Sequence, residues 1–471
     1  MTVSRRRFLQ TTSAVTATSL LACHSGVSAA EKTEDIRIAV IGCGGRGGSH
    51  IGAFKKSIVA LCDADEKTLA NRVKQLNNDN KVEGYTDYRK LLERKDIDAV
   101  SIATPNHQHS IMGILAAMAG KDVYVEKPVS HNVWEGRQLV NASRKYDRII
   151  QCGTQSRSSP SLKEAVKFVQ DGNLGKIKYA VGTCYKRRGS IGKLDKPLEI
   201  PEHIDFDLWC GPAAMEPIYR PRLHYDWHWD FNTGNGDMGN QGIHQMDIAR
   251  WFLGEAEISP RVMSIGGRVG YDDAGNTPNT QIVYHDYEKA PLIFETRGLG
   301  KDVNYRGSKI GVVIQCEKGY VVVPSYTSAI AYDDKDKEIK KWSGGGNHFG
   351  NFLDAVKSRK REDLNAEILD GHISSALCHT GNISHRVGQK ASASDIKADC
   401  QGDPLMSDSF ERMAKHLDAN EVDIDGSVVT LGPWIEFDTK AETITNNDEA
   451  KPLVTREYRK PYVVPDLTAS T

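Results

Sequence analysis

The 471-residue sequence lacks several features that would assign it to particular classes of protein. Its 61 basic and 62 acidic residues leave a net charge of −1 and are spread along the chain, so a nucleic-acid or anionic-membrane partner is not indicated. No apolar run is long enough to span a membrane, and no internal repeat is visible. The nine cysteines form no Cys-x-x-Cys pair and no disulfide-framework spacing, so neither zinc nor another metal is predicted. The composition is that of a globular protein, and the length leaves room for two domains.

Residues 1–30 predict a twin-arginine export signal. Residues 4–10 carry three consecutive arginines, residues 11–22 are weakly apolar and residues 27–30 are small, which is the order of regions in such signals. Cleavage near Ala30 would release a periplasmic protein, whereas the sequence LLAC ending at Cys23 could be a lipobox that anchors it through a lipid. Because twin-arginine substrates are exported already folded, this signal suits a protein that takes up a cofactor in the cytoplasm.

Residues 35–152 predict a Rossmann-type α/β domain built on a doubly wound parallel sheet. Short β-rich runs alternate with helical patterns, and the runs are nearly all apolar, as expected of parallel strands buried on both faces. The predicted strands are 36–41, 58–62, 99–103 and 122–125, and the clearest helices are 66–76 and 110–119.

Residues 153–389 predict a second, α+β domain with an open, mainly antiparallel sheet. Its β-rich runs follow one another without intervening helices, at 177–185, 261–269, 280–284, 292–297, 311–317 and 320–323. Helices predicted at 161–170, 244–252, 349–361 and 368–386 would cover one face. The long irregular segment 186–242 is expected to be functional. Residues 390–471 form a C-terminal extension with a helix near 410–417, and clamping a neighbouring subunit is one interpretation of its role.

A glycine turn follows the first predicted strand and precedes a helix, which is the position of a dinucleotide-binding turn. Gly42 permits the tight turn, Gly44 lets the backbone approach a pyrophosphate, and Gly47 allows close packing of helix on strand. The helix N-terminus then faces the phosphates. Gly45 and Arg46 complete the predicted cofactor contacts, although a solvated role for Arg46 remains open.

Asp63 ends the second predicted strand, about twenty residues after the glycine turn, where an acidic side chain binds the ribose hydroxyls. A carboxylate at this position repels a 2′-phosphate. The sequence therefore favours NAD over NADP as the cofactor.

Two further motifs follow later strands of the same predicted sheet. Thr104-Pro105-Asn106-His107-Gln108-His109 is expected at the carboxyl edge, with Thr104, Pro105, Asn106 and His109 at the cofactor. His109 could equally be a capping or packing histidine.

Glu126-Lys127-Pro128 follows the next strand and places Lys127 at the same edge, with Glu126 also assigned to the cofactor. Pro128 restricts the backbone before it, and a cis peptide bond there would be a plausible means of aiming the lysine.

A last motif, at residues 240–247, runs into a predicted helix. His244 is the side chain best suited to take a hydroxyl proton near neutral pH. Asn240 and Asp247 lie about one helical turn to either side and are predicted to bind the substrate. As lone residues, such side chains are more often core or capping groups.

Candidate substrate contacts lie in and before the long irregular segment. Trp227 or Trp229 could stack on a sugar ring, and Gln155 and Arg157 at the domain junction could bind its hydroxyls. A metal site is the less favoured interpretation of the interleaved residues His224, Asp226, His228 and Asp230.

Together these motifs resemble the glucose-fructose oxidoreductase, inositol dehydrogenase and rhizopine-catabolism (Gfo/Idh/MocA) family. The agreement runs from residue 36 to about residue 386 and rests on segments 41–47, 104–109, 126–128 and 242–247. The resemblance implies that Lys127 lies beside the nicotinamide and the substrate, and that His244 is the usual acid/base. It also implies a homo-oligomer, a dimer or a tetramer, often formed through the sheet face of the second domain.

One position departs from the family pattern. Many members carry an aspartate four residues before the histidine, and here that residue is Asn240. An amide can orient a hydroxyl but supplies no negative charge to an imidazolium. A His-Asp relay would therefore need Asp237 or Asp247 as a substitute.

The sequence thus predicts an exported, NAD-dependent oxidoreductase that acts on a CH–OH group of a sugar, sugar derivative or cyclitol. Lys127 would polarise the reacting hydroxyl, His244 would remove its proton, and the hydride would pass to a tightly held nicotinamide. Two alternatives stay open: a redox-assisted glycoside hydrolase or lyase, and a non-catalytic sugar-binding protein that retained the Rossmann core.

Overall fold

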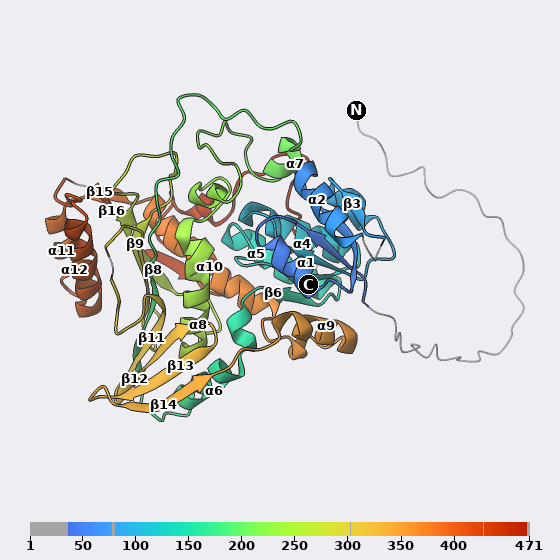
Figure 1. The fold of residues 1–471 in the computed structure, drawn as a ribbon. Coiled ribbons are helices and arrows are strands. Elements are labelled where there is room, and N and C mark those ends of the chain that lie inside the picture. Colours follow the sequence, from blue (N-terminus) through green and yellow to red (C-terminus); the bar gives the residue numbers. More distant parts are fainter. Residues whose placement is uncertain (1–35, 78–80, 302, 427, 469–471) are drawn as a thin grey trace, which may run out of the picture. The chain divides into compact units, whose positions relative to one another are not determined.

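The doubly wound parallel sheet is confirmed by the computed structural model, which describes residues 36–77, 81–301, 303–426 and 428–468. Six strands pair in parallel within these residues, in the order β3-β2-β1-β4-β5-β6 (Figure 1). The strands are β1 (Ile38–Ile41), β2 (Ile58–Cys62), β3 (Glu83–Tyr85), β4 (Ala99–Ile102), β5 (Asp122–Val125) and β6 (Ile150–Cys152). The helices are α1 (Gly47–Ala53), α2 (Glu66–Leu76), α3 (Tyr88–Leu92), the 3₁₀ turn η1 (Asn106–Gln108), α4 (His109–Met118) and α5 (Val133–Lys145).

The register of this sheet aligns the ends of its central strands. Ile41 of β1 pairs with Cys62 of β2 and with Ile102 of β4, and Ile102 pairs with Val125 of β5. Each of these residues is the last of its strand, so the segments that follow emerge at one carboxyl edge. Ligands bind at this edge in open α/β sheets.

The second sheet is mixed and mainly antiparallel, as the sequence predicts. Its order in the described residues is β14-β13-β12-β11-β7-β10-β9-β8-β16-β15, with β17 pairing both β8 and β18. β7 and β10 run parallel. The strands are β7 (Ile177–Cys184), β8 (Arg261–Gly267), β9 (Thr280–His285), β10 (Leu292–Arg297), β11 (Ile310–Cys316), β12 (Gly319–Ser325), β13 (Ser328–Asp333), β14 (Glu338–Ser343), β15 (Gln389–Ala391), β16 (Val429–Leu431), β17 (Ile435–Asp438) and β18 (Thr443–Ile444).

Helices cover the inner face of the second sheet and join it to the first domain. α10 (Ile368–Arg386) packs against α5 on one side and β8 on the other, and it begins and ends at the predicted residues. The approach to α5 is close, since a Cβ atom at Gly136 would lie 2.3 Å from His372 Nδ1. The remaining elements before α10 are η2 (Gln155–Ser158), α6 (Pro160–Gln170), α7 (Phe206–Cys210), η3 (Asp226–Trp229), the π-helical turn η4 (Met238–Gly242), α8 (Ile243–Leu253), α9 (His348–Ser358) and η5 (Arg361–Asp363).

The C-terminal residues pack on their own chain. α11 (Ala393–Cys400) and α12 (Pro404–Ala419) lie on the outer face of the large sheet, opposite α8 and α10 (Figure 1). Phe410 and Met413 of α12 share a buried cluster with Ile265 and Ile282 of the sheet. After η6 (Lys451–Val454) the chain returns to the Rossmann domain, where Tyr462 is buried against its core.

The export signal and the Cys23 lipobox predicted within residues 1–30 lie outside the described residues. In the part of the chain that the structure describes, no helix combines the length and the apolar character needed to cross a membrane.

The contact between Gly47 and the turn gives a test of the fold. A Cβ atom at Gly47 would lie 1.9 Å from Gly42 O, whereas one at Gly52 of the same helix would meet no atom within 4 Å. Gly47→Ala should therefore lower the free energy of unfolding by about 1–3 kcal/mol. Gly52→Ala, the matched control, should raise it by about 0.5–1 kcal/mol. Urea unfolding of both variants checks this, and equal stabilities would contradict the packing described.

Candidate functional site

A cleft of about 680 Å³ opens at the carboxyl edge of the parallel sheet. Cavities of this size hold cofactors and small substrates. One end is formed by the glycine turn, Asp63 and Thr68, and the middle by Thr104, Pro105, Asn106, His109 and Glu126. The other end is formed by Lys127, Trp209, His224, Tyr225, Trp227, His228 and Asn240.

The glycine turn has the shape needed to receive a pyrophosphate. Gly42 has a φ of +86°, and a Cβ atom there would lie 2.7 Å from the carbonyl carbon of Ala103. A Cβ atom at Gly44 would meet only Thr68 Cγ2, at 3.9 Å, and one at Gly45 would meet nothing within 4 Å. The turn therefore presents bare backbone to the cleft at the start of α1, and its residues fit a dinucleotide.

Asp63 is held at the adenosine end by the backbone. Its Oδ2 accepts a hydrogen bond of 2.7 Å from Cys43 N, and its Oδ1 accepts one of 3.0 Å from Asp65 N. Burial raises the pKa of Asp63, while these two backbone donors lower it. The carboxyl group lines the cleft in a fixed orientation, as binding of ribose hydroxyls would require.

Glu126 is a buried carboxylate beneath the cleft. It accepts hydrogen bonds from Arg46 Nε at 2.7 Å and His50 Nε2 at 3.0 Å, and Gln155 Nε2 lies 3.4 Å away. Although burial by itself raises the pKa of Glu126, the bond from His50 and the charge of Arg46 hold that pKa well below its ordinary value. Arg46 and Gln155 are thus engaged with Glu126, and Gln155 is not among the residues that line the cleft.

Lys127 reaches the cleft from a cis Lys127–Pro128 peptide bond. Its Nζ donates a hydrogen bond of 2.7 Å to the carbonyl oxygen of Asn240, in the π-helical turn before α8. Burial lowers the pKa of Lys127, and the charge of Glu126 opposes that shift. Turns of this kind often occur at functional sites.

His109 lies behind this lysine and ties two loops together. Its ring nitrogens are 2.6 Å from Pro128 O and 2.7 Å from Thr104 O. A neutral imidazole donates through only one nitrogen, so in that form one of the two contacts is a hydrogen bond. The residue packs between the two loops and also lines the cleft.

His244 lies near the start of α8, is 7% exposed and is not among the residues that line the cleft. Its ring centroid is 4.7 Å from that of Tyr326. Burial, together with the positive charge of Lys127, lowers the pKa of His244 to about 3. The side chain is therefore a neutral imidazole at physiological pH.

Neither predicted carboxylate substitute reaches His244. Asp237 binds Arg188 through both oxygens, with Nε at 2.7 Å, and Asp247 binds Arg157 with Nε at 2.8 Å. A His-Asp relay through either aspartate is therefore incompatible with this arrangement.

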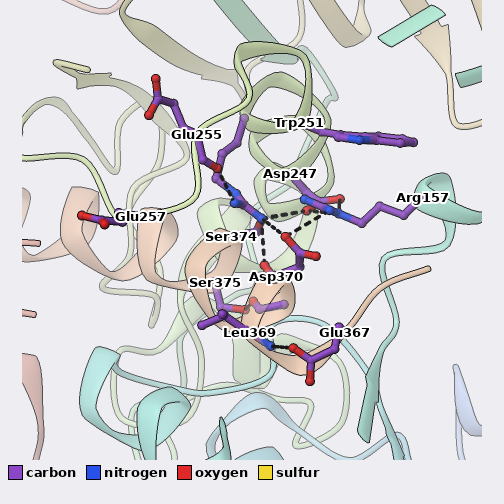
Figure 2. Close-up of polar contacts among 12 residues, drawn as sticks. Arg157, Asp247, Trp251, Glu255, Glu257, Glu367, Leu369, Asp370, Ser374 and Ser375 are labelled. Atoms are coloured by element: carbon purple, nitrogen blue, oxygen red, sulfur yellow. Dashed lines mark hydrogen bonds and ion pairs between the residues drawn. The ribbon is translucent and has the colours of Figure 1, made fainter. Parts of the chain in front are cut away.

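Arg157 and Asp247, both predicted to bind the substrate, are not among the residues that line the cleft. Figure 2 shows both in a buried network with Asp370 and Ser374 of α10. Ser374 Oγ donates to Asp247 Oδ1 at 2.7 Å, and Arg157 also stacks over Trp251 at 5.5 Å. Because Asp247 is 1% exposed and saturated with donors, it joins α8, α10 and η2 instead of facing the cleft.

The two tryptophans predicted to stack on a sugar ring have different surroundings. Trp227 lines the cleft, as a stacking surface for a sugar ring would. Trp229 does not, because it is 2% exposed and covered by the guanidinium of Arg268 at 4.8 Å.

The four residues considered for a metal contact different partners. His224 bonds to Asp65, Asp226 to Arg222, His228 to the carbonyl oxygen of Tyr225, and Asp230 to Asn232 and Asn276. Over residues 36–77, 81–301, 303–426 and 428–468, no group of three or more His, Cys, Asp or Glu side chains is placed to hold a metal ion.

Sequence reasoning assigned no cofactor or substrate contact to several residues at the site. Trp209, His224 and Tyr225 line the cleft, and Tyr326 packs on His244 and accepts a hydrogen bond from Gln241. Their concentration in an irregular segment rich in aromatic residues was a signal for Trp209, His224 and Tyr225. No local pattern marks Tyr326, which lies in a turn between β12 and β13.

Two family models match the chain. One, "Oxidoreductase family, NAD-binding Rossmann fold", covers residues 36–154. The other, "Oxidoreductase family, C-terminal alpha/beta domain", covers residues 161–410. Both are parts of the Gfo/Idh/MocA family description.

Three curated relatives illustrate the similarity. An uncharacterized oxidoreductase, YrbE of Bacillus subtilis, is 33% identical over 299 residues, covering 59% of this chain and 77% of that protein. The levoglucosan dehydrogenase of Pseudarthrobacter phenanthrenivorans is 24% identical, covering 43% of this chain and only 44% of that protein. A glycosyl hydrolase family 109 protein of Shewanella is 33% identical over 171 residues, covering 30% of this chain and 37% of that protein.

Among solved structures, the WlbA dehydrogenase of Bordetella pertussis in complex with NADH and UDP-GlcNAcA has a similar fold. The TM-score is 0.56 at 18% identity, covering 75% of this chain and 97% of that one.

The buried ion pair provides a test of this arrangement. Asp247→Asn should lower the free energy of unfolding by about 1–3 kcal/mol, because it removes the carboxylate that accepts from Arg157 Nε and leaves that guanidinium only its 3.2 Å contact with Asp370. Asp171→Asn, which breaks an exposed pair with Lys167, is the control and should change stability little. Urea unfolding measures both. Unchanged stability with a raised KM for the substrate would instead support a binding role for Asp247.

Proposed function

Because the chain belongs to the Gfo/Idh/MocA oxidoreductase family, we propose that it is an NAD-dependent oxidoreductase of sugars, sugar derivatives or cyclitols. The observation that carries this proposal is the single cleft that joins the glycine turn and Asp63 to Lys127 and Trp227. A dinucleotide would occupy the first end and supply hydride transfer at a CH–OH carbon. A polyol would occupy the second end, where cationic, amide and aromatic side chains meet.

In this proposal Lys127 positions and polarises the reacting hydroxyl. It lines the cleft, it is fixed by its bond to Asn240 O, and Glu126 and Arg46 set its electrostatic surroundings. A lysine side chain can donate a hydrogen bond to a hydroxyl oxygen and exchange a proton with it.

His244 would receive the hydroxyl proton in its neutral form. Burial and the positive charge of Lys127 keep the ring unprotonated in the free protein, so a ring nitrogen is available to accept a hydrogen bond from that hydroxyl. Asn240, which lines the cleft one turn ahead, would orient a neighbouring hydroxyl through its amide. Tyr326 would hold the imidazole ring in place.

The relatives support a carbohydrate or cyclitol as substrate. They include a levoglucosan dehydrogenase, and the WlbA structure contains NADH and a sugar nucleotide. Trp227 and Tyr225 in the cleft offer apolar faces to the C–H side of a sugar ring. We infer NAD rather than NADP from the carboxylate of Asp63.

We further propose that residues 1–30 export the folded protein by the twin-arginine pathway to the periplasm. There is no evident supply of exchangeable NAD outside the cytoplasm. The protein would therefore retain its cofactor and run a closed cycle, in which one sugar hydroxyl is oxidised and one sugar carbonyl is reduced. A homo-oligomer, soluble or anchored through Cys23, is part of the same proposal.

A second candidate is redox-assisted cleavage of a glycosidic bond, which the glycosyl hydrolase relative favours. Oxidation at one ring carbon acidifies the adjacent C–H bond, elimination expels the aglycone, and reduction restores the carbon without net NADH. This reaction needs a base beyond the one for the hydroxyl. A non-catalytic sugar-binding role would leave Lys127 and His244 apart: Lys127 lines the same cleft as Gly44, which disfavours that role, whereas His244 does not line it.

The roles proposed for Lys127 and His244 predict that replacing either residue lowers kcat. His244→Asn should lower kcat by roughly 10²–10⁴-fold, and Lys127→Met should do at least the same. Lys121→Met is a matched control, because Lys121 Nζ also donates to backbone carbonyls, of Arg94 and Ile97, but lies outside the cleft. In the parent protein kcat/KM should show no acidic limb near pH 6.5, since His244 is already neutral there. Retention of full kcat by His244→Asn would remove that residue from the mechanism.

Cofactor retention tests the closed cycle. Protein purified after export should release near-stoichiometric NAD or NADH when it is denatured, measured by absorbance and mass spectrometry. An empty protein whose activity depends strictly on added NAD would contradict a closed cycle.

On the same preparation, release of the leaving group from an aryl glycoside without net NADH would assign glycoside cleavage in place of sugar oxidation.

A further inference from the structure

Residues 203–233, a part of the long irregular segment, form one wall of the cleft, and we call them the wall segment. The side chains that this segment contributes to the cleft are Leu208, Trp209, His224, Tyr225, Trp227 and His228. The glycine turn and Asp63 belong to the edge of the parallel sheet. A dinucleotide in the cleft would therefore lie between the sheet edge and the wall segment.

On one flank of the cleft, the wall segment is joined to the loop that follows β2. Ile204 pairs with Asp65 in an isolated antiparallel bridge. Asp205 N donates a hydrogen bond of 2.9 Å to Ala64 O. Figure 1 shows that α7, which follows this bridge, lies beside α2. The wall segment therefore reaches the flank of the cleft at which Asp63 lies.

The carboxylate of Asp65 adds two side-chain contacts to this junction. Its Oδ1 lies 3.0 Å from His203 Nδ1, and its Oδ2 lies 3.2 Å from His224 Nε2. Although burial raises the pKa of Asp65, hydrogen bonds from Thr68 and His224 lower that pKa overall. Because an ionised carboxylate only accepts hydrogen bonds, both histidines donate to it.

His224 is the residue of this junction that faces the cleft. Its side chain is 57% exposed and lines the cleft. Burial raises the pKa of Asp63, and His224 is among the groups that oppose this shift, so the two side chains lie near each other. With Nε2 donating to Asp65, a neutral His224 ring keeps Nδ1 as an acceptor for a hydroxyl group. Asp63 on the sheet edge and His224 on the wall segment are thus both available to the adenosine ribose.

On the other flank, the wall segment is joined to the residues that follow β4. Gln108 Nε2 donates to Leu208 O at 2.9 Å and to Trp209 O at 2.8 Å. The ring nitrogens of His107 lie 3.0 Å from Trp209 O and 3.0 Å from Thr233 O. The wall segment is therefore attached to the Rossmann domain on both flanks of the cleft.

The C-terminal extension holds the same wall segment through residues that do not line the cleft. Tyr462 OH donates to Asp207 Oδ2 at 2.6 Å, and Arg459 Nη2 donates to Asp207 O at 2.7 Å. Arg459 Nε also donates to Gly211 O at 3.1 Å. Contacts from three separate parts of the chain therefore keep the wall segment in place.

We propose that the wall segment is a fixed cover over the bound nicotinamide cofactor, and that His224, held by Asp65, is a cofactor-binding residue that slows the cofactor's release. This inference rests on the proposed function, because it gives a physical basis for a cofactor that stays bound through the catalytic cycle. Release would require the wall segment to move away from the sheet edge. That movement breaks the contacts at Asp65 or those at His107 and Gln108.

The test is the dissociation rate constant of NADH, measured on the purified protein. Protein loaded with NADH is mixed with a large excess of NAD, and the loss of the fluorescence of bound NADH gives the rate constant. His224→Ala should raise it by roughly tenfold or more, because it removes a charge-assisted hydrogen bond from the wall segment and a contact with the cofactor. Asp65 is left unchanged, because its side chain also caps α2.

Lys193→Met is the matched control. Lys193 belongs to the same irregular segment and forms an exposed ion pair with Asp272, outside the cleft, so its loss should leave the NADH dissociation rate constant unchanged. If the parent protein binds NADH and folded His224→Ala releases it at the parent rate, this inference is wrong and the proposed function stands. A parent protein that binds neither NAD nor NADH would overturn both.

Hydrogen exchange tests the cover without a substitution, should His224→Ala fail to fold. Loaded protein should be protected, relative to protein stripped of its cofactor, in peptides that span residues 203–209 and 224–229 as well as in the glycine turn. Protection confined to the glycine turn and residues 104–109 would show that the wall segment does not cover the cofactor.

Discussion

The parallel register of β1 with β2 and β4 is the constraint on which the first site depends. Because Ile41 lies opposite both Cys62 and Ile102, the residues that follow these strands begin at one height along the sheet. A one-residue slip would turn alternate side chains to the other face and separate Asp63 from the glycine turn. The turn can follow β1 directly because Gly42 and Gly47 have no side chains to separate α1 from the sheet.

Buried charge then sets the chemistry at this edge. Glu126 is 3% exposed, yet it stays ionised because Arg46 and His50 donate hydrogen bonds to it. Its negative charge raises the pKa of Lys127 against the effect of burial, and Lys127 in turn helps to keep His244 neutral. The surroundings thus act differently on the three side chains: donors hold the pKa of Glu126 down, and burial is the largest cause that lowers the pKa values of Lys127 and His244. Such separation of charge states by environment is how active sites divide acid and base roles.

The sequence alone predicts those strands and helices that a local pattern of apolar residues determines. The apolar runs of the parallel sheet and the helix Ile368–Arg386 were predicted at or near their observed bounds, since each has a clear periodicity or a wholly apolar run. β14 reads EIKKWS and buries only Trp342, so it has no alternation to detect and suits an exposed edge. Arg157 and Asp247 lie beside motif residues, but their partners Asp370 and Ser374 are more than a hundred residues away in sequence. A contact of that separation leaves no local signal, and the pair was therefore assigned to a substrate.

The C-terminal extension changes which surfaces the second domain can offer. Helices α11 and α12 bury Phe410 and Met413 against the outer face of β8 to β10, so that part of the sheet is closed by the chain itself. A second copy that docks on this face would have to use β11 to β14, where Tyr320 and Tyr332 stack at 5.0 Å. The chain then continues past η6 to the Rossmann core, where Leu467 N donates to Gln138. On that return path Arg456 donates to the carbonyl and side-chain oxygens of Asn232, so the segment that ties the two domains together also holds the loop after η3.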